Sequence, residues 1–151
     1  MNTEKSRAEN SKKSLHNADF TDADLKEANL SSGILIEACL EGADLSEADL
    51  CDADISSASF EGARLHRTLF YRCRGRDANF TGAILTQANL VEANLIGADF
   101  SDANLSESNI EGADLKNTKL KNANLSDTNM TGAFLSNADL SNADFTNAEL
   151  I

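Results

Sequence analysis

The chain has 151 residues, contains no Pro or Trp, and is 41% apolar, mostly through Ala and Leu. A formal net charge of -12 disfavours nonspecific binding to nucleic acid and favours solubility. No apolar run approaches the roughly 18 residues of a membrane span, and the three cysteines, Cys39, Cys51 and Cys73, share no metal-ligand spacing. We expect one cytoplasmic protein without membrane contact, because an odd cysteine count fits a reducing compartment.

The first 17 residues are polar and precede the regular pattern. Residues 1–14 read MNTEKSRAENSKKS and contain no apolar segment of the kind that a secretory signal needs. Leu15 and Phe20 offer the apolar contacts nearest to this segment. The residues fit both a short cap and a disordered tail. We therefore divide the chain into an N-terminal tail or cap, 1–17, and a repeat domain, 18–151.

From residue 15 onward the sequence repeats every five residues. The 28 positions divisible by five hold eighteen Leu, six Phe, Ile55, Ile110, Met130 and one exception, Gly75. Two residues earlier, from position 18 on, 21 of 27 positions are Ala, and the others are small. The residue between these two columns is Asp or Asn at 17 of 27 positions. Two variable, mostly polar residues complete the unit, and no insertion interrupts it.

A period of five fits neither an α-helix nor a straight strand. Five residues advance about 140° around a helix, so the leucines would spread over every face. In a strand, side chains alternate with period two, so an odd repeat would turn each successive Leu to the opposite face. The pattern therefore predicts a short strand in each repeat, with Ala and Leu inside and Asp outside, followed by a two-residue corner.

The glycines suggest how many corners close one coil. Gly42, Gly62 and Gly82 lie 20 residues apart at the second corner position. Four of the six column phenylalanines, at positions 20, 60, 80 and 100, fall on one face if a coil has 20 residues. Both observations favour four repeats per coil and a square cross-section.

Three stretches carry a resemblance to a known family. GADLSEADLCDAD (residues 42–54), ANLVEANLIGADFSDANL (88–105) and SNADLSNADFTNAEL (136–150) resemble the pentapeptide-repeat family. The resemblance implies an all-β fold, a right-handed quadrilateral parallel β-helix of about seven 20-residue coils. With parallel strands about 4.8 Å apart, such a rod is roughly 30 Å long.

Gly75 removes one large side chain from the predicted core. A cavity in a packed core is costly. We expect the rings of Phe70 and Phe80, in the flanking repeats, to lean into the space.

No set of residues predicts catalysis, a cofactor or a metal. Calcium needs six to eight converging oxygens, whereas the Asp and Asn side chains project outward from flat faces. We expect these side chains to bind neighbouring backbone. His16 and His66 are fifty residues apart, and no phosphate-binding or nucleophile motif is present.

Residues 64–76, RLHRTLFYRCRGR, depart from the acidic pattern. This arginine segment holds five of the six arginines and the single Tyr, with a formal charge of +5 against -17 for the rest of the chain. Arg and Tyr are over-represented in binding hot spots. The candidate partner-binding residues are Arg64, His66, Arg67, Tyr71, Arg72, Arg74 and Arg76. The alternative is a structural variation whose arginines pair with Asp44, Glu47 and Asp52 in neighbouring coils.

The repeats run in register to the last residues of the sequence. An exposed coil end presents apolar side chains and unpaired strand edges. We therefore expect an end-to-end homodimer through a candidate surface made of Leu135, Leu140, Phe145, Leu150 and Ile151.

These observations favour a non-catalytic scaffold that binds a protein partner of unknown identity and no nucleic acid. The resemblance implies an alternative, since some pentapeptide-repeat proteins bind DNA gyrase or topoisomerase IV as duplex-DNA mimics and confer quinolone resistance. A DNA rod of roughly 30 Å carries about 18 negative charges. The acidic residues approach this number, but a basic segment in mid-rod is poor mimicry of DNA.

Overall fold

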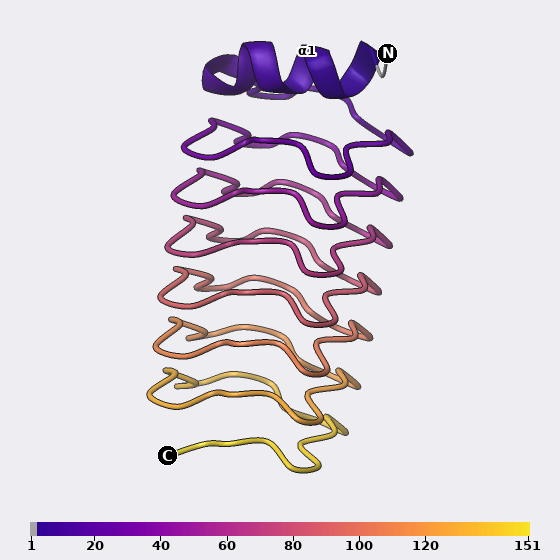
Figure 1. Cartoon of the computed structure of the whole chain (residues 1–151). Helices are drawn as coiled ribbons and strands as arrows, with labels where there is room; N and C mark the ends of the chain where they lie inside the picture. Colours follow the sequence, from indigo (N-terminus) through magenta and orange to yellow (C-terminus); the bar gives the residue numbers. More distant parts are fainter. Residues whose placement is uncertain (1–2) are drawn as a thin grey trace.

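In a computed structural model, which describes residues 3–151, a short helix precedes a stack of square coils (Figure 1). The helix α1 spans Thr3–Ser11 and continues into a 3-10 turn, η1, at Lys12–Ser14. Each side of a coil pairs through one central residue, and all these bridges are parallel. They join residues 20 apart, from Asp19–Cys39 to Asn129–Glu149. The predicted fold, a right-handed parallel β-helix with four repeats per coil, is confirmed.

The two inward columns form one continuous core along the axis of the rod. Leu45, Leu90 and their equivalents are fully buried, as are the alanines two residues before them. A strand of three residues directs its first and third side chains to one face, so each repeat buries one large and one small side chain. The period of five therefore directs every Leu or Phe inward.

One repeat, residues 44–48, shows how the backbone amides are paired. The amide of Asp44 donates to the carbonyl of Ala23 in the preceding coil at 2.9 Å, and the amides of Leu45 and Glu47 donate to the following coil at 2.8 Å each. The amide of Ala48 closes the corner by donating to the carbonyl of Leu45 at 2.9 Å. Four of the five amides of a repeat thus find backbone acceptors.

The fifth amide explains the Asp and Asn column. It belongs to the first corner residue, and in this repeat the amide of Ser46 donates to Oδ1 of Asp44 at 3.1 Å. The same contact recurs along the rod, for example from Cys51 to Asp49 and from Val91 to Asn89. A buried or half-buried amide without an acceptor is costly. The expectation that the outward Asp and Asn side chains bind neighbouring backbone is confirmed.

The second corner residue adopts the left-handed conformation in every repeat. All second corner positions from Asn17 to Asn147 have positive φ, including six glycines such as Gly42 (φ 66°). Gly, Asn and Asp tolerate this conformation best. The corner composition of the sequence follows from this backbone geometry.

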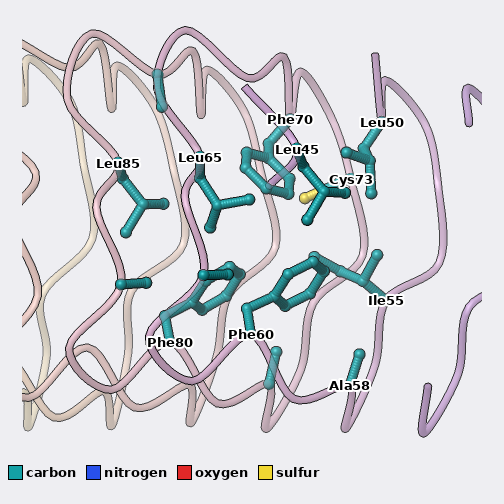
Figure 2. Packing of buried hydrophobic residues seen from close by; sticks show 14 of the residues in the cluster. Leu45, Leu50, Ile55, Ala58, Phe60, Leu65, Phe70, Cys73, Phe80 and Leu85 are labelled. Atoms are coloured by element: carbon teal, nitrogen blue, oxygen red, sulfur yellow. The ribbon is translucent and has the colours of Figure 1, made fainter. Parts of the chain in front are cut away.

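Phenylalanine rings stack along one inner face at the middle of the rod (Figure 2). Phe60 and Phe80 are parallel with ring centroids 4.9 Å apart, and Phe80 and Phe100 are parallel at 4.7 Å. These distances equal the spacing of neighbouring strands. From the opposite side, Phe70 meets Phe60 and Phe80 edge-on at 6.1 and 5.9 Å.

The space beside Gly75 is closed differently from the prediction. The atoms nearest to its missing side chain belong to Leu95, at 2.9 Å from an added Cβ, and to Ile55, at 3.2 Å. These two residues follow and precede Gly75 in the same column. The expectation that Phe70 and Phe80 fill the space is wrong, because Phe80 stays stacked in its own column.

The N-terminal segment covers the first coil. Ala8 and Leu15 are buried in the core, and the guanidinium of Arg7 lies 4.7 Å from the ring centroid of Phe20. The helix also satisfies amides that later coils would pair with a preceding coil. Oε1 of Glu9 accepts from the amide of Asn29 at 2.9 Å, and the Lys12 carbonyl accepts from Ile34 at 2.6 Å. Residues 3–14 therefore form a cap.

None of the helical segments between residues 3 and 151 has the length and apolarity that crossing a bilayer requires.

The packing at Gly75 makes a prediction about stability. Gly75→Leu should destabilise the fold by about 1–3 kcal/mol, because the added side chain must displace Ile55 and Leu95 from a packed core. Adding Leu95→Ala to this variant should restore part of the loss by making room. Thermal or urea unfolding measures both. A clear stability gain in Gly75→Leu alone would show that the site is an unfilled void.

Candidate interaction surface

The side chains between residues 3 and 151 form neither a pocket nor a group of three His, Cys, Asp or Glu residues placed to hold a metal ion. The outer faces are flat, so recognition by this rod depends on what its outward side chains present. Every interior coil is paired on both sides through its backbone. A partner on the flank of the rod therefore meets side chains and cannot extend the ladder.

The arginine segment occupies most of one coil near the middle of the rod. Arg64 bridges to Asp44 and Ile84 on one side of the coil, and Arg74 bridges to Asp54 and Asn94 two sides further on. All five arginines of the segment are exposed, while His66 and Tyr71 are half-buried at the corners between them. The predicted candidate residues thus form a band around three corners of the rod.

Two arginines pair with aspartates of the preceding coil. Nε of Arg72 lies 3.4 Å from Oδ1 of Asp52, and Nε of Arg74 lies 3.2 Å from Oδ2 of Asp54. A hydrogen bond with Tyr71 and the charge of Asp52 raise the pKa of Arg72. Both pairs use Nε, so the ion pairs leave the terminal Nη groups of each guanidinium unused.

The remaining arginines are not held by ion pairs. Nε of Arg67 donates to Oε1 of Gln87 at 2.9 Å, and within residues 3–151 neither Arg64 nor Arg76 makes an ion pair. The suggested pairing of the arginines with Asp44, Glu47 and Asp52 is therefore correct for Asp52 alone. Asp44 pairs with Lys26 at 3.2 Å instead. Exposed pairs of this kind contribute only about 0–1 kcal/mol each.

Two apolar side chains complete the band, and neither was predicted from the sequence. Leu69 is 39% exposed and Ile84 is 43% exposed, at outward positions where the column usually carries Asp or Asn. Leu69 lies on the side of the coil between the corners of Arg67 and Arg72, and Ile84 follows Arg64 on the adjacent side. The sequence does contain the signal, since large apolar residues in the outward column are rare.

Leu69 has a local cost that nothing in the fold repays. An Asn here would accept a hydrogen bond from the amide of Tyr71, as Asp49 and Asn89 do for the same corner in the neighbouring coils. Such a bond contributes about 0.5–1.5 kcal/mol. The Leu69 side chain gives up this bond and remains exposed. Core packing therefore does not explain its presence.

The strand that carries Leu69 is fixed from inside. The Thr68 hydroxyl is buried and donates to the carbonyl of Leu45 at 2.8 Å. Phe70 is fully buried and contacts Phe60 and Phe80 edge-on. Leu69 therefore projects from a strand whose two neighbouring side chains are locked in the core.

The charges around this band differ on its two sides. The preceding coil carries Glu47, Asp49 and Asp52 opposite Arg67, Leu69 and Arg72. At the equivalent positions the following coil carries Gln87, Asn89 and Glu92, and Val91 follows Tyr71. The band is thus bounded by an acidic coil on its N-terminal side and a more neutral coil on its C-terminal side.

The cysteines have the properties of structural residues. Burial raises the pKa of the Cys51 thiol to about 11, with a further contribution from Asp49. Cys73 is fully buried, and burial raises its pKa as well. A thiol is nucleophilic only as the thiolate, so both are protonated and unreactive at neutral pH.

The end of the last coil is the second surface that the sequence predicted. Leu140 and Leu150 are exposed, the latter by 54%, and Ile151 is fully exposed. Leu135 and Phe145 are half-buried. Another exposed ring, Phe134, is contacted by the Lys116 ammonium group at 5.0 Å from the ring centroid.

The described geometry defines the class, a right-handed solenoid of 20-residue coils with four repeats in each. Two family models match this sequence: one described as a pentapeptide repeat region, over residues 53–130, and one described as pentapeptide repeats in eight copies, over residues 11–35 and 34–70. The chain belongs to the pentapeptide-repeat family. A search of curated proteins finds no match.

Several solved structures are similar. A pentapeptide repeat protein of the Arabidopsis thaliana thylakoid lumen is 36% identical, with a TM-score of 0.62 over 63% of this chain and 66% of its own. HetL of Nostoc sp. strain PCC 7120, involved in heterocyst differentiation regulation, is 30% identical, with a TM-score of 0.50 over 87% of this chain and 72% of its own. This chain spans slightly less than two thirds of the thylakoid protein.

The fluoroquinolone resistance protein QnrB1 is also similar, in a form with a TM-score of 0.54 and 24% identity over 87% of this chain and 71% of its own. At this identity the likeness extends to the fold alone.

Proposed function

We propose that this protein is a non-catalytic scaffold that docks a protein partner on its arginine segment. The observation that carries the proposal is the combination of exposed Leu69 and Ile84 with exposed arginines on one band. Aromatic residues and arginines dominate the energetics of protein interfaces, and clustered exposed apolar residues mark interaction sites.

Two further features support a scaffold over an enzyme. The flat faces offer no concave site to enclose a substrate, which enzymes need to exclude water and orient reactants. The two thiols with raised pKa values, Cys51 and Cys73, are poor nucleophiles at neutral pH.

The alternative, mimicry of duplex DNA toward a topoisomerase, has weaker support. The basic band interrupts the acidic surface in the middle of the rod, whereas DNA is negative along its whole length. The likeness to QnrB1 concerns the fold alone. Duplex mimicry therefore stays an untested prediction.

Affinity capture tests the docking proposal. The triple variant Arg67→Gln, Arg72→Gln, Arg76→Gln should lose a partner that the wild-type chain captures from the lysate of its native cell. The matched control, Lys116→Gln, Lys119→Gln, Lys121→Gln, removes the same charge two coils away and should retain it. Both variants should melt close to the wild type, because exposed ion pairs contribute about 0–1 kcal/mol each. A salt-sensitive loss of several degrees in the arginine variant, with capture unchanged, would make the segment structural.

We also propose that the exposed end of the last coil pairs with the same end of a second copy. Leu140, Phe145, Leu150 and Ile151 would be covered in a two-fold arrangement. Light scattering should report a dimer for the wild type and a monomer for Leu150→Lys with Ile151→Lys, because a charged side chain cannot be buried there without a partner. A wild type that is monomeric at high micromolar concentration contradicts this proposal.

A further inference from the structure

The band around Leu69 combines features that together specify a partner. It has one exposed apolar side chain in the centre of a flat strand, two arginines at the corners on either side, and acidic residues one coil away. The inference rests on the docking proposal above and concerns the chemistry of the docked segment.

We propose that the partner supplies an extended acidic segment in which an apolar side chain stands between carboxylates. The apolar side chain packs on Leu69, and the carboxylates bind Arg67 and Arg72. The backbone from Arg67 to Arg72 spans at most about 18 Å. An extended segment that lies along this side of the coil can therefore reach both corners.

The arginines are prepared for bidentate binding. Arg67 uses Nε for Gln87, and Arg72 uses Nε for Asp52. These contacts orient the guanidinium groups and leave the paired Nη groups for a carboxylate. A carboxylate bound through two parallel N–H groups is held more strongly and more specifically than one bound by a single contact.

The surroundings favour a narrow acidic segment over a broad polyanion. One coil rises about 4.8 Å, so Glu47, Asp49 and Asp52 lie close beside the band. A wide anionic surface such as duplex DNA or an acidic membrane would be repelled by these carboxylates and by the net charge of -17 outside the segment. A single strand of protein can place its carboxylates on the band and avoid the acidic coil.

The partner's remaining contacts should fall on the following coil. There Gln87, Asn89 and Val91 offer amide and apolar groups beside the band. Ile84, 43% exposed, extends the apolar surface in the same direction. The footprint is therefore expected to spread toward the C-terminal coils and away from residues 47–52.

The surface is also rigid before the partner arrives. Thr68 and Phe70 hold the strand from inside, and the amides of Arg67 and Arg72 donate to the next coil at 3.0 Å each. Binding to such a surface orders few of this chain's own groups, which lowers the entropic cost of association.

Selection from a random-peptide display library tests the proposal before any natural partner is identified. Peptides enriched on the wild-type protein should carry Asp or Glu on both sides of an apolar residue. They should bind Arg67→Gln with Arg72→Gln at least about tenfold more weakly, and bind Lys116→Gln with Lys119→Gln as tightly as the wild type. Raising the salt concentration should weaken binding.

Leu69→Asn provides the second variant, because it restores the residue type that this column carries elsewhere. It should fold at least as stably as the wild type and bind the selected peptides at least about tenfold more weakly. Enrichment of neutral or basic peptides, failure to enrich any peptide, or retention by Leu69→Asn would overturn the acidic-segment proposal. So would binding of phosphatidylserine vesicles or short duplex DNA that depends on Arg67 and Arg72. Loss of cellular capture in the triple arginine variant, combined with any of these results, would leave docking intact and reject only its proposed chemistry.

Discussion

The structure depends on the pairing of the five backbone amides in each repeat. Three donate to neighbouring coils and one closes the corner, and these bonds fix the 20-residue register. The fifth, on the first corner residue, needs a side-chain oxygen two residues earlier, which Asp or Asn supplies. This requirement explains why the outward column is polar even though it faces solvent. It also means that each departure from Asp or Asn gives up a hydrogen bond, so such departures point to another role.

The sequence predicted the coil because its constraints are local and identical in every repeat. The inward columns, the 20-residue coil and the role of the Asp and Asn side chains all follow from five-residue patterns. Contacts between coils were harder to predict. Gly75 is covered by Ile55 and Leu95 because side chains 20 residues away relax toward it, and Asp44 pairs with Lys26 because several cations compete for each carboxylate. Leu69 and Ile84 were not predicted because their exposure leaves the charge pattern and the period of five unchanged.

The functional account follows from the same geometry. A rod with paired interior coils can present side chains in a fixed arrangement, and one coil can differ from its neighbours without disturbing them. The arginine segment uses this freedom: its inner residues, such as Thr68 and Phe70, keep the coil intact, while its outer residues replace the common polar pattern with arginines and an exposed Leu. A narrow basic band on an acidic rod can select a partner by charge and by width together.

Residue-resolved hydrogen exchange tests the central claim most directly. The amides of Cys51, Tyr71 and Val91 occupy the same corner in three successive coils, and only those of Cys51 and Val91 have an acceptor on the residue two positions earlier. The account predicts faster exchange for Tyr71 than for the other two, and slow exchange for Arg72, whose amide donates to the next coil at 3.0 Å. Equal protection of Tyr71, or rapid exchange throughout residues 64–76, would contradict it.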